Sequence, residues 1–153
     1  MGVMAMRSIP EGLSTATPYL IVQDGNGAIE FYQKAFGATL KERMEDGQGR
    51  LRHAEFRIGN SMFMLGEYPG LQVPAPGGFP SLSIYLYVDD ADAVHRRAVT
   101  AGATSCGEVK DQYYGDRQGG VRDPYGITWW IATHIEDVSN EELQRRMAAR
   151  AGA

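Results

Sequence analysis

The chain contains one internal repeat, and this repeat constrains the fold more than any other sequence feature. The pattern Tyr19-Leu20-x-Val22-x-Asp24, followed by Gly37-Ala38-Thr39, returns as Tyr85-Leu86-x-Val88-x-Asp90 followed by Gly102-Ala103-Thr104. The shift is 85 − 19 = 66 residues at the first pattern and 102 − 37 = 65 at the second. A shift this constant indicates duplication of one structural unit. Two copies are too few for a solenoid.

Each copy begins with an alternating strand and continues into an amphipathic helix. Leu20 and Val22 alternate with Thr17 and Tyr19, and the second copy alternates in the same way. Asp24 or Asn26 is expected to cap the first helix, and Asp89 or Asp90 the second, with Gly37 and Gly102 as the stops. The helix residues that should pack on the sheets are Ala28, Ile29, Tyr32, Ala35, Phe36, Val94, Ala98 and Ala101.

The rest of each copy is predicted to be strands. Residues 52–58 alternate, Gly59-Asn60 is a two-residue hairpin signal, and residues 61–66 form the returning strand. In the second copy the candidates are residues 105–110, 116–122 and 127–133, with a turn at Asp123-Pro124-Tyr125-Gly126 joining the last two. The sequence therefore predicts an α+β fold of two βαβββ modules in tandem.

A single domain fits the size of the chain. With 153 residues, 43% of them hydrophobic, the chain can bury one substantial core. We expect one domain over residues 14–136, with halves of about 14–68 and 81–136 joined by a linker, Leu71 to Pro80. Ser139 and Glu142 form a capping box, so residues 137–153 are expected to be a tail with a short helix from Asn140 to about Arg150.

Charge and composition exclude several classes of partner. The net charge is −4 and lysines and arginines do not cluster, which argues against nucleic acid and anionic membranes as partners. No apolar run approaches the roughly 18 residues of a membrane-spanning helix. The single cysteine, Cys106, cannot form an intrachain disulfide, and Met1 to Leu13 lack the features of a signal peptide. A cytoplasmic protein is the resulting expectation.

The strand faces opposite the helices are neither apolar nor fully polar. Because side chains alternate along a strand, one face should collect Thr17, Tyr19, His53, Glu55, Arg57, Met62, Met64, Ser83, Tyr85, Tyr87 and Trp130. Large aromatics are unusual on a face open to water, and charged groups are costly in a sealed core. The mixture predicts a cavity for an amphipathic ligand or a subunit interface. The alternative is that this face packs against the other half.

Three segments resemble those of a known superfamily. Residues 19–38 resemble the opening strand and helix of vicinal oxygen chelate proteins, the glyoxalase/bleomycin resistance protein/dioxygenase superfamily. Gly115-Asp116-Arg117 and Arg122 to Trp129 are similar to its last hairpin, and Ile131 to Ser139 resembles the PhnB-like branch. The resemblance implies the tandem βαβββ fold and a homodimer. It implies no single reaction, because the superfamily includes isomerases, lyases, dioxygenases, thiol transferases and drug-sequestering proteins.

The resemblance also places a metal site, and the residues here do not suit it. Metal-dependent members hold a divalent ion with four strand residues, whose positions fall on Thr17, Met64, Ser83 and Trp130. A thioether and an indole do not bind such ions, and two hydroxyls are too weak. The three histidines, His53, His95 and His134, show no ligand spacing. We therefore expect no metal and no other cofactor.

A set of aromatic and small polar residues remains for ligand binding. Tyr19, Tyr85 and Trp130 could stack on a planar ligand, Met64 could adapt to its shape, and Thr17 or Ser83 could hydrogen-bond it. Tyr114 could close over the cavity mouth or merely cover the sheet. Arg117 could clamp an anion or pair with Asp116 or Glu108. Strand parity places Arg117 with Val121, away from the cavity, unless Gly119-Gly120 forms a bulge.

Three functions follow as hypotheses. The first is a bleomycin-resistance-type protein that binds a small amphipathic or aromatic molecule without a metal. The second is a glyoxalase-type lyase or isomerase that uses His53 and Glu55 as acid and base, or a metal not placed by the sequence. The third is a structural or partner-binding dimer without a ligand. His95 is expected on the solvent side of its helix, and His134 in an ordinary surface role.

Overall fold

The computed structural model describes residues 6–73 and 80–152, and the chain divides into two compact units, Met1–Gln72 and Val73–Ala153. Most of the expected linker, residues 74–79, lies outside the described residues. Within the part of the chain that the structure describes, no helix is long and apolar enough to cross a membrane.

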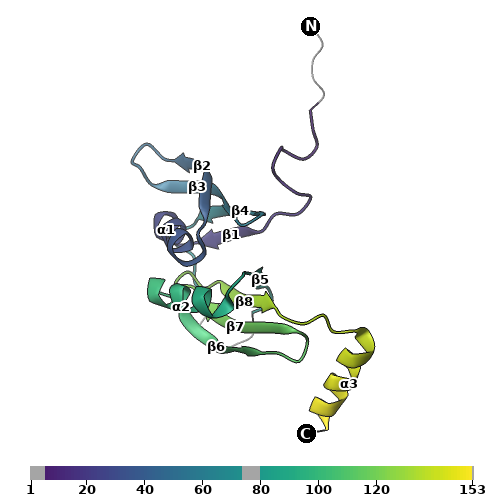
Figure 1. The fold of residues 1–153 in the computed structure, drawn as a ribbon. Helices are drawn as coiled ribbons and strands as arrows, with labels where there is room; N and C mark the ends of the chain where they lie inside the picture. Colours follow the sequence, from purple (N-terminus) through teal and green to yellow (C-terminus); the bar gives the residue numbers. More distant parts are fainter. Residues whose placement is uncertain (1–5, 74–79, 153) are drawn as a thin grey trace. The chain divides into compact units, whose positions relative to one another are not determined.

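Both units are βαβββ modules, which confirms the predicted fold (Figure 1). The first consists of β1 (Tyr19–Val22), α1 (Gly25–Phe36), β2 (Thr39–Glu45), β3 (Leu51–Ile58) and β4 (Ser61–Glu67). The second consists of β5 (Ile84–Tyr87), α2 (Ala91–Ala101), β6 (Thr104–Asp111), β7 (Asp116–Arg122) and β8 (Thr128–His134), and the chain continues into α3 (Asn140–Ala151). The sheet orders are β1-β4-β3-β2 and β5-β8-β7-β6, and the first strand of each sheet runs parallel to its neighbour.

Side-chain caps set where the three helices begin. Asp24 accepts a hydrogen bond from Gly27 N and caps α1, and Asp90 accepts one from Ala93 N and caps α2, each at 3.0 Å. Ser139 accepts one from Glu142 N and caps α3, as the capping box predicts. The sequence offered two possible caps for each of the first two helices. In both cases the cap is the residue directly before the helix, Asp24 for α1 and Asp90 for α2.

Each helix covers one face of its own sheet and leaves the other face uncovered within its unit. In the first unit Tyr32 of α1 stacks on Phe56, which stacks on Phe63, with ring centroids 5.3 and 5.2 Å apart. In the second unit the buried residues Trp129 and Val121 lie on the α2 side with Ala98. The burial of alternate strand residues confirms the period-two pattern expected from the sequence.

The turn between β7 and β8 depends on one buried carboxylate. Asp123 is 4% exposed, and its Oδ1 accepts hydrogen bonds from the backbone N–H groups of Tyr125 and Ile127, both at 2.9 Å. Its Oδ2 accepts a third, also 2.9 Å, from the indole Nε1 of Trp129 in the core. The predicted turn is thus present, and its first residue also joins the turn to the apolar core.

Replacing Asp123 with Ala should destabilise the protein strongly, because several donors would lose a buried partner. An unsatisfied buried donor costs about 1–3 kcal/mol, so we expect a loss of at least ~3 kcal/mol in the free energy of unfolding, measured by urea denaturation. Asp46→Ala is the matched control, because Asp46 accepts from the N–H groups of Gln48 and Arg50 in an exposed turn. Equal losses in the two variants would contradict the role assigned to the Trp129 bond.

Candidate ligand-binding site

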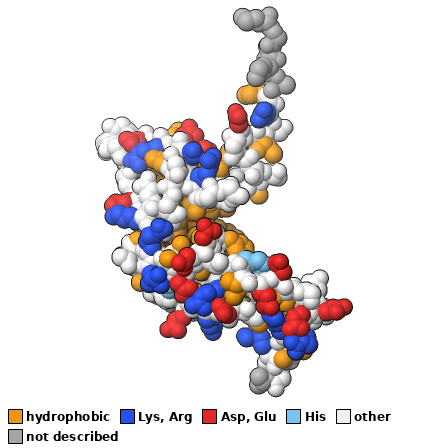
Figure 2. Space-filling model, in the orientation of Figure 1, with side chains coloured by type: hydrophobic (Ala, Val, Ile, Leu, Met, Phe, Trp, Pro, Cys, Tyr) orange, Lys and Arg blue, Asp and Glu red, His pale blue; other side chains and the backbone are white. Residues whose placement is uncertain are grey.

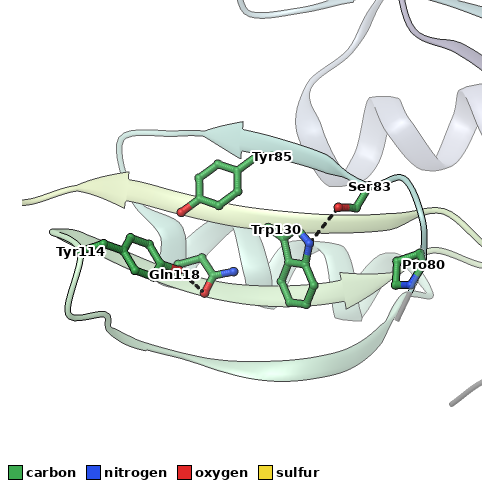
Figure 3. A pocket seen from close by; sticks show the side chains of 6 residues that line it. All are labelled: Pro80, Ser83, Tyr85, Tyr114, Gln118 and Trp130. Carbon is green, nitrogen blue, oxygen red and sulfur yellow. Dashed lines mark hydrogen bonds between the residues drawn. The ribbon is translucent and has the colours of Figure 1, made fainter. Parts of the chain in front are cut away.

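A pocket of about 330 Å³ opens on the β5-β8-β7 surface of the second unit, on the face away from α2 (Figure 3). Its lining combines three aromatic rings with three smaller side chains: Pro80, Ser83, Tyr85, Tyr114, Gln118 and Trp130. Four of these, Ser83, Tyr85, Tyr114 and Trp130, are ligand-binding candidates from the sequence. The volume falls in the range usual for small-molecule sites.

The indole of Trp130 forms the central wall of the pocket, and two neighbours fix its position. Its Nε1 donates a 3.0 Å hydrogen bond to the Ser83 hydroxyl. Its ring covers Gly120, which pairs with Trp130 across β7 and β8. A Cβ atom on Gly120 would lie 2.5 Å from Cζ3 of the indole, so a glycine is needed for the ring to lie flat on the sheet.

The irregularity considered at Gly119-Gly120 lies in the neighbouring strand. β7 pairs with β8 in continuous register through both glycines, whereas β6 shifts register twice against β7, between Ser105 and Gly107 and between Gly107 and Lys110. A Cβ atom on Gly119 would lie 2.7 Å from Cγ2 of Val109, so the bulged strand approaches β7 closely here.

Because β7 is regular, strand parity holds and Arg117 does not line the pocket. Its Nε and Nη2 donate to the two carboxylate oxygens of Asp92 on α2, at 2.6 and 2.9 Å. Its Nη1 donates to Asp111 at 2.9 Å. Arg117 therefore pairs on the helix side, with acids other than the Asp116 and Glu108 considered from the sequence.

Gln118 supplies a polar group at the other end of the pocket, and the sequence reasoning missed it. Gln118 is 9% exposed, and its Oε1 accepts a 3.4 Å hydrogen bond from the Tyr114 hydroxyl. Its amide nitrogen is turned toward Trp130 (Figure 3). Strand alternation could have predicted this position, because Gln118 lies two residues from Gly120 and therefore on the face opposite Arg117 and Val121. Pro80, at the end of the linker, carried no such signal.

A buried aspartate holds the tyrosines at the edge of the pocket. Asp116 is 4% exposed and accepts hydrogen bonds from the hydroxyls of Tyr85 at 2.7 Å and Tyr87 at 2.9 Å. His134 Nδ1 lies 2.8 Å from the other carboxylate oxygen, and His134 Nε2 lies 2.7 Å from Asp137. His134 therefore joins the pocket's supporting network, a larger role than the surface one expected.

Hydrogen bonding and burial together shift the pKa values of Tyr85, Asp116 and His134. Burial followed by the bond to Asp116 raises the pKa of Tyr85 far above its ordinary value, so its hydroxyl stays protonated. Burial alone would raise the pKa of Asp116, but the bonds from Tyr85, His134 and Tyr87 outweigh it and lower that pKa. The bonds to Asp116 and then Asp137 raise the pKa of His134. The arrangement favours an ionised Asp116 that accepts from every neighbour.

The remaining candidates lie in the first unit. Tyr19 pairs with Met64, and Met64 with Glu55, so these three share one row of the sheet. The Tyr19 hydroxyl lies 3.3 Å from Nδ1 of His53, and its ring covers Gly66. Thr17 is half-buried just before β1. The two acid–base candidates, His53 and Glu55, therefore share a half-buried face with Tyr19, and neither lines the pocket of the second unit.

Corresponding rows of the two sheets carry different side chains. Tyr19 and Met64 correspond to Tyr85 and Trp130, 66 residues later. On the neighbouring strand, Met64 pairs with Glu55, whereas Trp130 pairs with Gly120. The second unit therefore combines a large ring with a glycine that the ring covers, where the first has a flexible thioether and a carboxylate. The other histidine, His95, is half-buried with Nε2 3.1 Å from the Gly120 carbonyl, which corrects its expected solvent-facing position.

The residues at the superfamily's metal positions do not form a suitable donor set. In the second unit, the indole of Trp130 is hydrogen-bonded to Ser83. In the first unit, Met64 contributes a half-buried thioether. An indole and a thioether are poor ligands for the divalent ions of this superfamily. Among residues 6–73 and 80–152, no three His, Cys, Asp or Glu side chains gather in a way that could hold a metal ion.

Comparison with known proteins shows the family of this chain. Residues 13–131 match the model of the Glyoxalase/Bleomycin resistance protein/Dioxygenase superfamily. An uncharacterized protein of Mycobacterium bovis is 36% identical over 140 residues, which cover 88% of this chain and 92% of that protein. Among solved structures, TioX from Micromonospora is 28% identical with a TM-score of 0.64, covering 80% of this chain and 99% of TioX. A PhnB protein from Bacillus cereus shares the fold at 18% identity and a TM-score of 0.62, covering 78% of this chain and 99% of that one. The chain belongs to the glyoxalase/bleomycin resistance protein/dioxygenase superfamily.

Proposed function

We propose that this protein binds a small, planar, uncharged aromatic molecule in the pocket of its second unit, without a metal. The observation that carries the proposal is the half-buried indole of Trp130, which lies over Gly120, is held there by Ser83 and lines the pocket. An indole fixed in this way presents a ring face on which another planar ring can stack.

The lining defines the chemistry of the ligand. None of the six lining residues is an Asp, Glu, Lys, Arg or His, so the lining itself offers no charged group to an anion or a cation. The Gln118 amide nitrogen can donate a hydrogen bond to a ligand acceptor, since the oxygen of the same amide is occupied by Tyr114. A flat ring system with one acceptor, such as a ring nitrogen or a carbonyl oxygen, fits this combination.

The first prediction concerns where such a molecule binds. Quinoline added to the wild-type protein should shift the indole N–H signal of Trp130 in NMR spectra and leave that of Trp129 unchanged, because Trp129 is fully buried and bonded to Asp123. Trp130→Leu should weaken quinoline binding in equilibrium dialysis about 2- to 12-fold, the factor that corresponds to the ~0.5–1.5 kcal/mol of an aromatic pair.

Tyr68→Leu is the matched control for Trp130→Leu. Tyr68 is an aromatic residue 55% exposed in the first unit and outside the pocket, so its loss should leave the affinity for quinoline unchanged. Saturable binding that Trp130→Leu does not weaken would refute the proposed site, and the absence of binding to the wild type would count against planar heteroaromatic ligands.

The second prediction concerns the hydrogen-bond donor. Wild-type protein should bind quinoline more tightly than naphthalene, which has the same shape and lacks the ring nitrogen. Gln118→Met keeps the length of the side chain and removes the amide, so it should abolish this preference, which we expect to be roughly 2- to 10-fold for one neutral hydrogen bond.

The control for the amide is Gln33→Met, an exposed position on α1 at which the preference should persist. A preference for quinoline that persists in Gln118→Met would show that another group donates the hydrogen bond to the quinoline nitrogen. Loss of binding of both compounds in that variant would mean that Gln118 shapes the pocket instead of selecting the ligand.

A further inference from the structure

The wall of the pocket opposite Ser83 belongs to a turn, which contacts the sheet through Tyr114 and through a 3.3 Å hydrogen bond from Gln112 Nε2 to the carbonyl oxygen of Gln118. Residues Gln112 to Gly115 join β6 to β7 and carry Tyr113 and Tyr114, both half-buried. Within the turn, Gln112 N donates to Asp116 O at 2.7 Å and Gly115 N donates to Gln112 O at 3.2 Å. Tyr114 reaches the sheet through its long bond to Gln118.

The segment that follows β8 holds the backbone at the end of this turn. The carbonyl oxygen of Gly115 accepts hydrogen bonds from the N–H groups of Ile135 at 2.9 Å and Glu136 at 3.0 Å. Gly115 has φ +98°, and a Cβ atom there would overlap the Glu136 carbonyl. The close approach of the two segments therefore depends on a glycine at this position.

Arg146 on α3 holds the middle of the turn. Its Nη1 donates to the carbonyl oxygen of Tyr113 at 3.0 Å and to Glu136 at 2.8 Å, and its Nη2 donates to the other Glu136 oxygen at 2.9 Å. Its Nε donates to Glu142 at 3.0 Å. Such bidentate, charge-assisted bonds are stronger than neutral ones and fix direction.

Two ring contacts extend the arrangement to Tyr114. The guanidinium of Arg150 lies over the Tyr113 ring, 4.6 Å from its centroid. The Tyr113 and Tyr114 rings meet edge to face, with centroids 5.2 Å apart and an interplanar angle of 83°. The helix thus contacts Tyr113, and Tyr113 contacts the residue that lines the pocket.

α3 itself is placed by these polar contacts. It has no buried residue along its length, and the face of the molecule in Figure 2 shows acidic and basic side chains intermixed. A helix without buried apolar side chains gains little from the hydrophobic effect, so its charged contacts with the turn and with residue 136 decide where it lies.

We infer that residues 135–151 form a clamp, the tail clamp, which fixes the turn of residues 112–115 and makes Tyr114 a preformed wall of the pocket. Arg146 is its positioning residue. The inference rests on the proposed function only for its effect on ligand affinity, because the order of the turn can be measured without any ligand.

The test compares Arg146→Met with Arg145→Met in the full chain. Arg145 is the matched control, because it also pairs with Glu142 and, among the described residues, makes no hydrogen bond to the turn. Its side chain is 70% exposed, against 27% for Arg146. Arg146→Met should make chymotrypsin cleave after Tyr113 and Tyr114 on the order of 10-fold faster, since losing a charge-assisted bond raises the open population by at least that factor. Hydrogen exchange of the Trp130 indole N–H should rise and that of Trp129 should not.

Binding provides the second readout. Quinoline affinity should fall about 2- to 10-fold in Arg146→Met, the cost of ordering one aromatic side chain upon binding, and Arg146→Lys should recover part of it by donating to Tyr113 O. Arg145→Met should match the wild type in every measurement. Faster exchange at Trp129 as well would indicate a general loss of stability and overturn the clamp.

Two other outcomes also overturn the inference: an unchanged cleavage rate in Arg146→Met, or a loosened turn with unchanged quinoline affinity. If the wild type does not bind quinoline, the proposed function loses support. Cleavage at the turn and exchange at Trp130 then decide alone whether the clamp exists.

Discussion

Each sheet of this protein is covered by one helix, and the rest of the structure depends on that asymmetry. Aliphatic and aromatic side chains from alternate strand positions pack against α1 or α2 and supply the core, as the Tyr32-Phe56-Phe63 stack illustrates. The intervening positions receive no cover within their unit. They are therefore free of the demands of core packing, and they carry the tyrosines, the histidine and the indole from which a site can be built.

The two modules use this freedom differently. Their backbones share strand order and pairing, and a tyrosine occupies the corresponding position of β1 and β5, Tyr19 in one and Tyr85 in the other. What separates them is one pair of adjacent positions, where Glu55 and Met64 in one sheet correspond to Gly120 and Trp130 in the other. Because residue 120 has no side chain, the indole ring can lie over the strand and line the pocket. The fold is thus repeated, while the residues that line this pocket are those of the second copy.

Much of the fold could be predicted because its signals are local. The repeat, the alternation, the caps and the hairpin at Gly59-Asn60 each depend on a few neighbouring residues. Strand parity assigned Ser83, Tyr85 and Trp130 to the face that carries the pocket and Arg117 to the opposite face. The parts that failed depend on contacts between distant residues. The burial of Asp116 under two tyrosine hydroxyls, the docking of His95 on the Gly120 carbonyl and the hold of Arg146 on Tyr113 each join separate elements. Which acid an exposed arginine selects cannot be deduced from its neighbours in the chain.

The contact between Gly120 and the Trp130 ring has a consequence for how this pocket can change over generations. No side chain fits at residue 120 while the indole lies there, and a smaller residue at 130 leaves the glycine beneath it bare. A substitution at residue 120 alone would therefore displace the ring, and a smaller residue at 130 alone would expose backbone. A lineage that acquires a different ligand through this row must exchange both residues, and the order of the two steps is constrained: the ring has to be reduced before the glycine can gain a side chain.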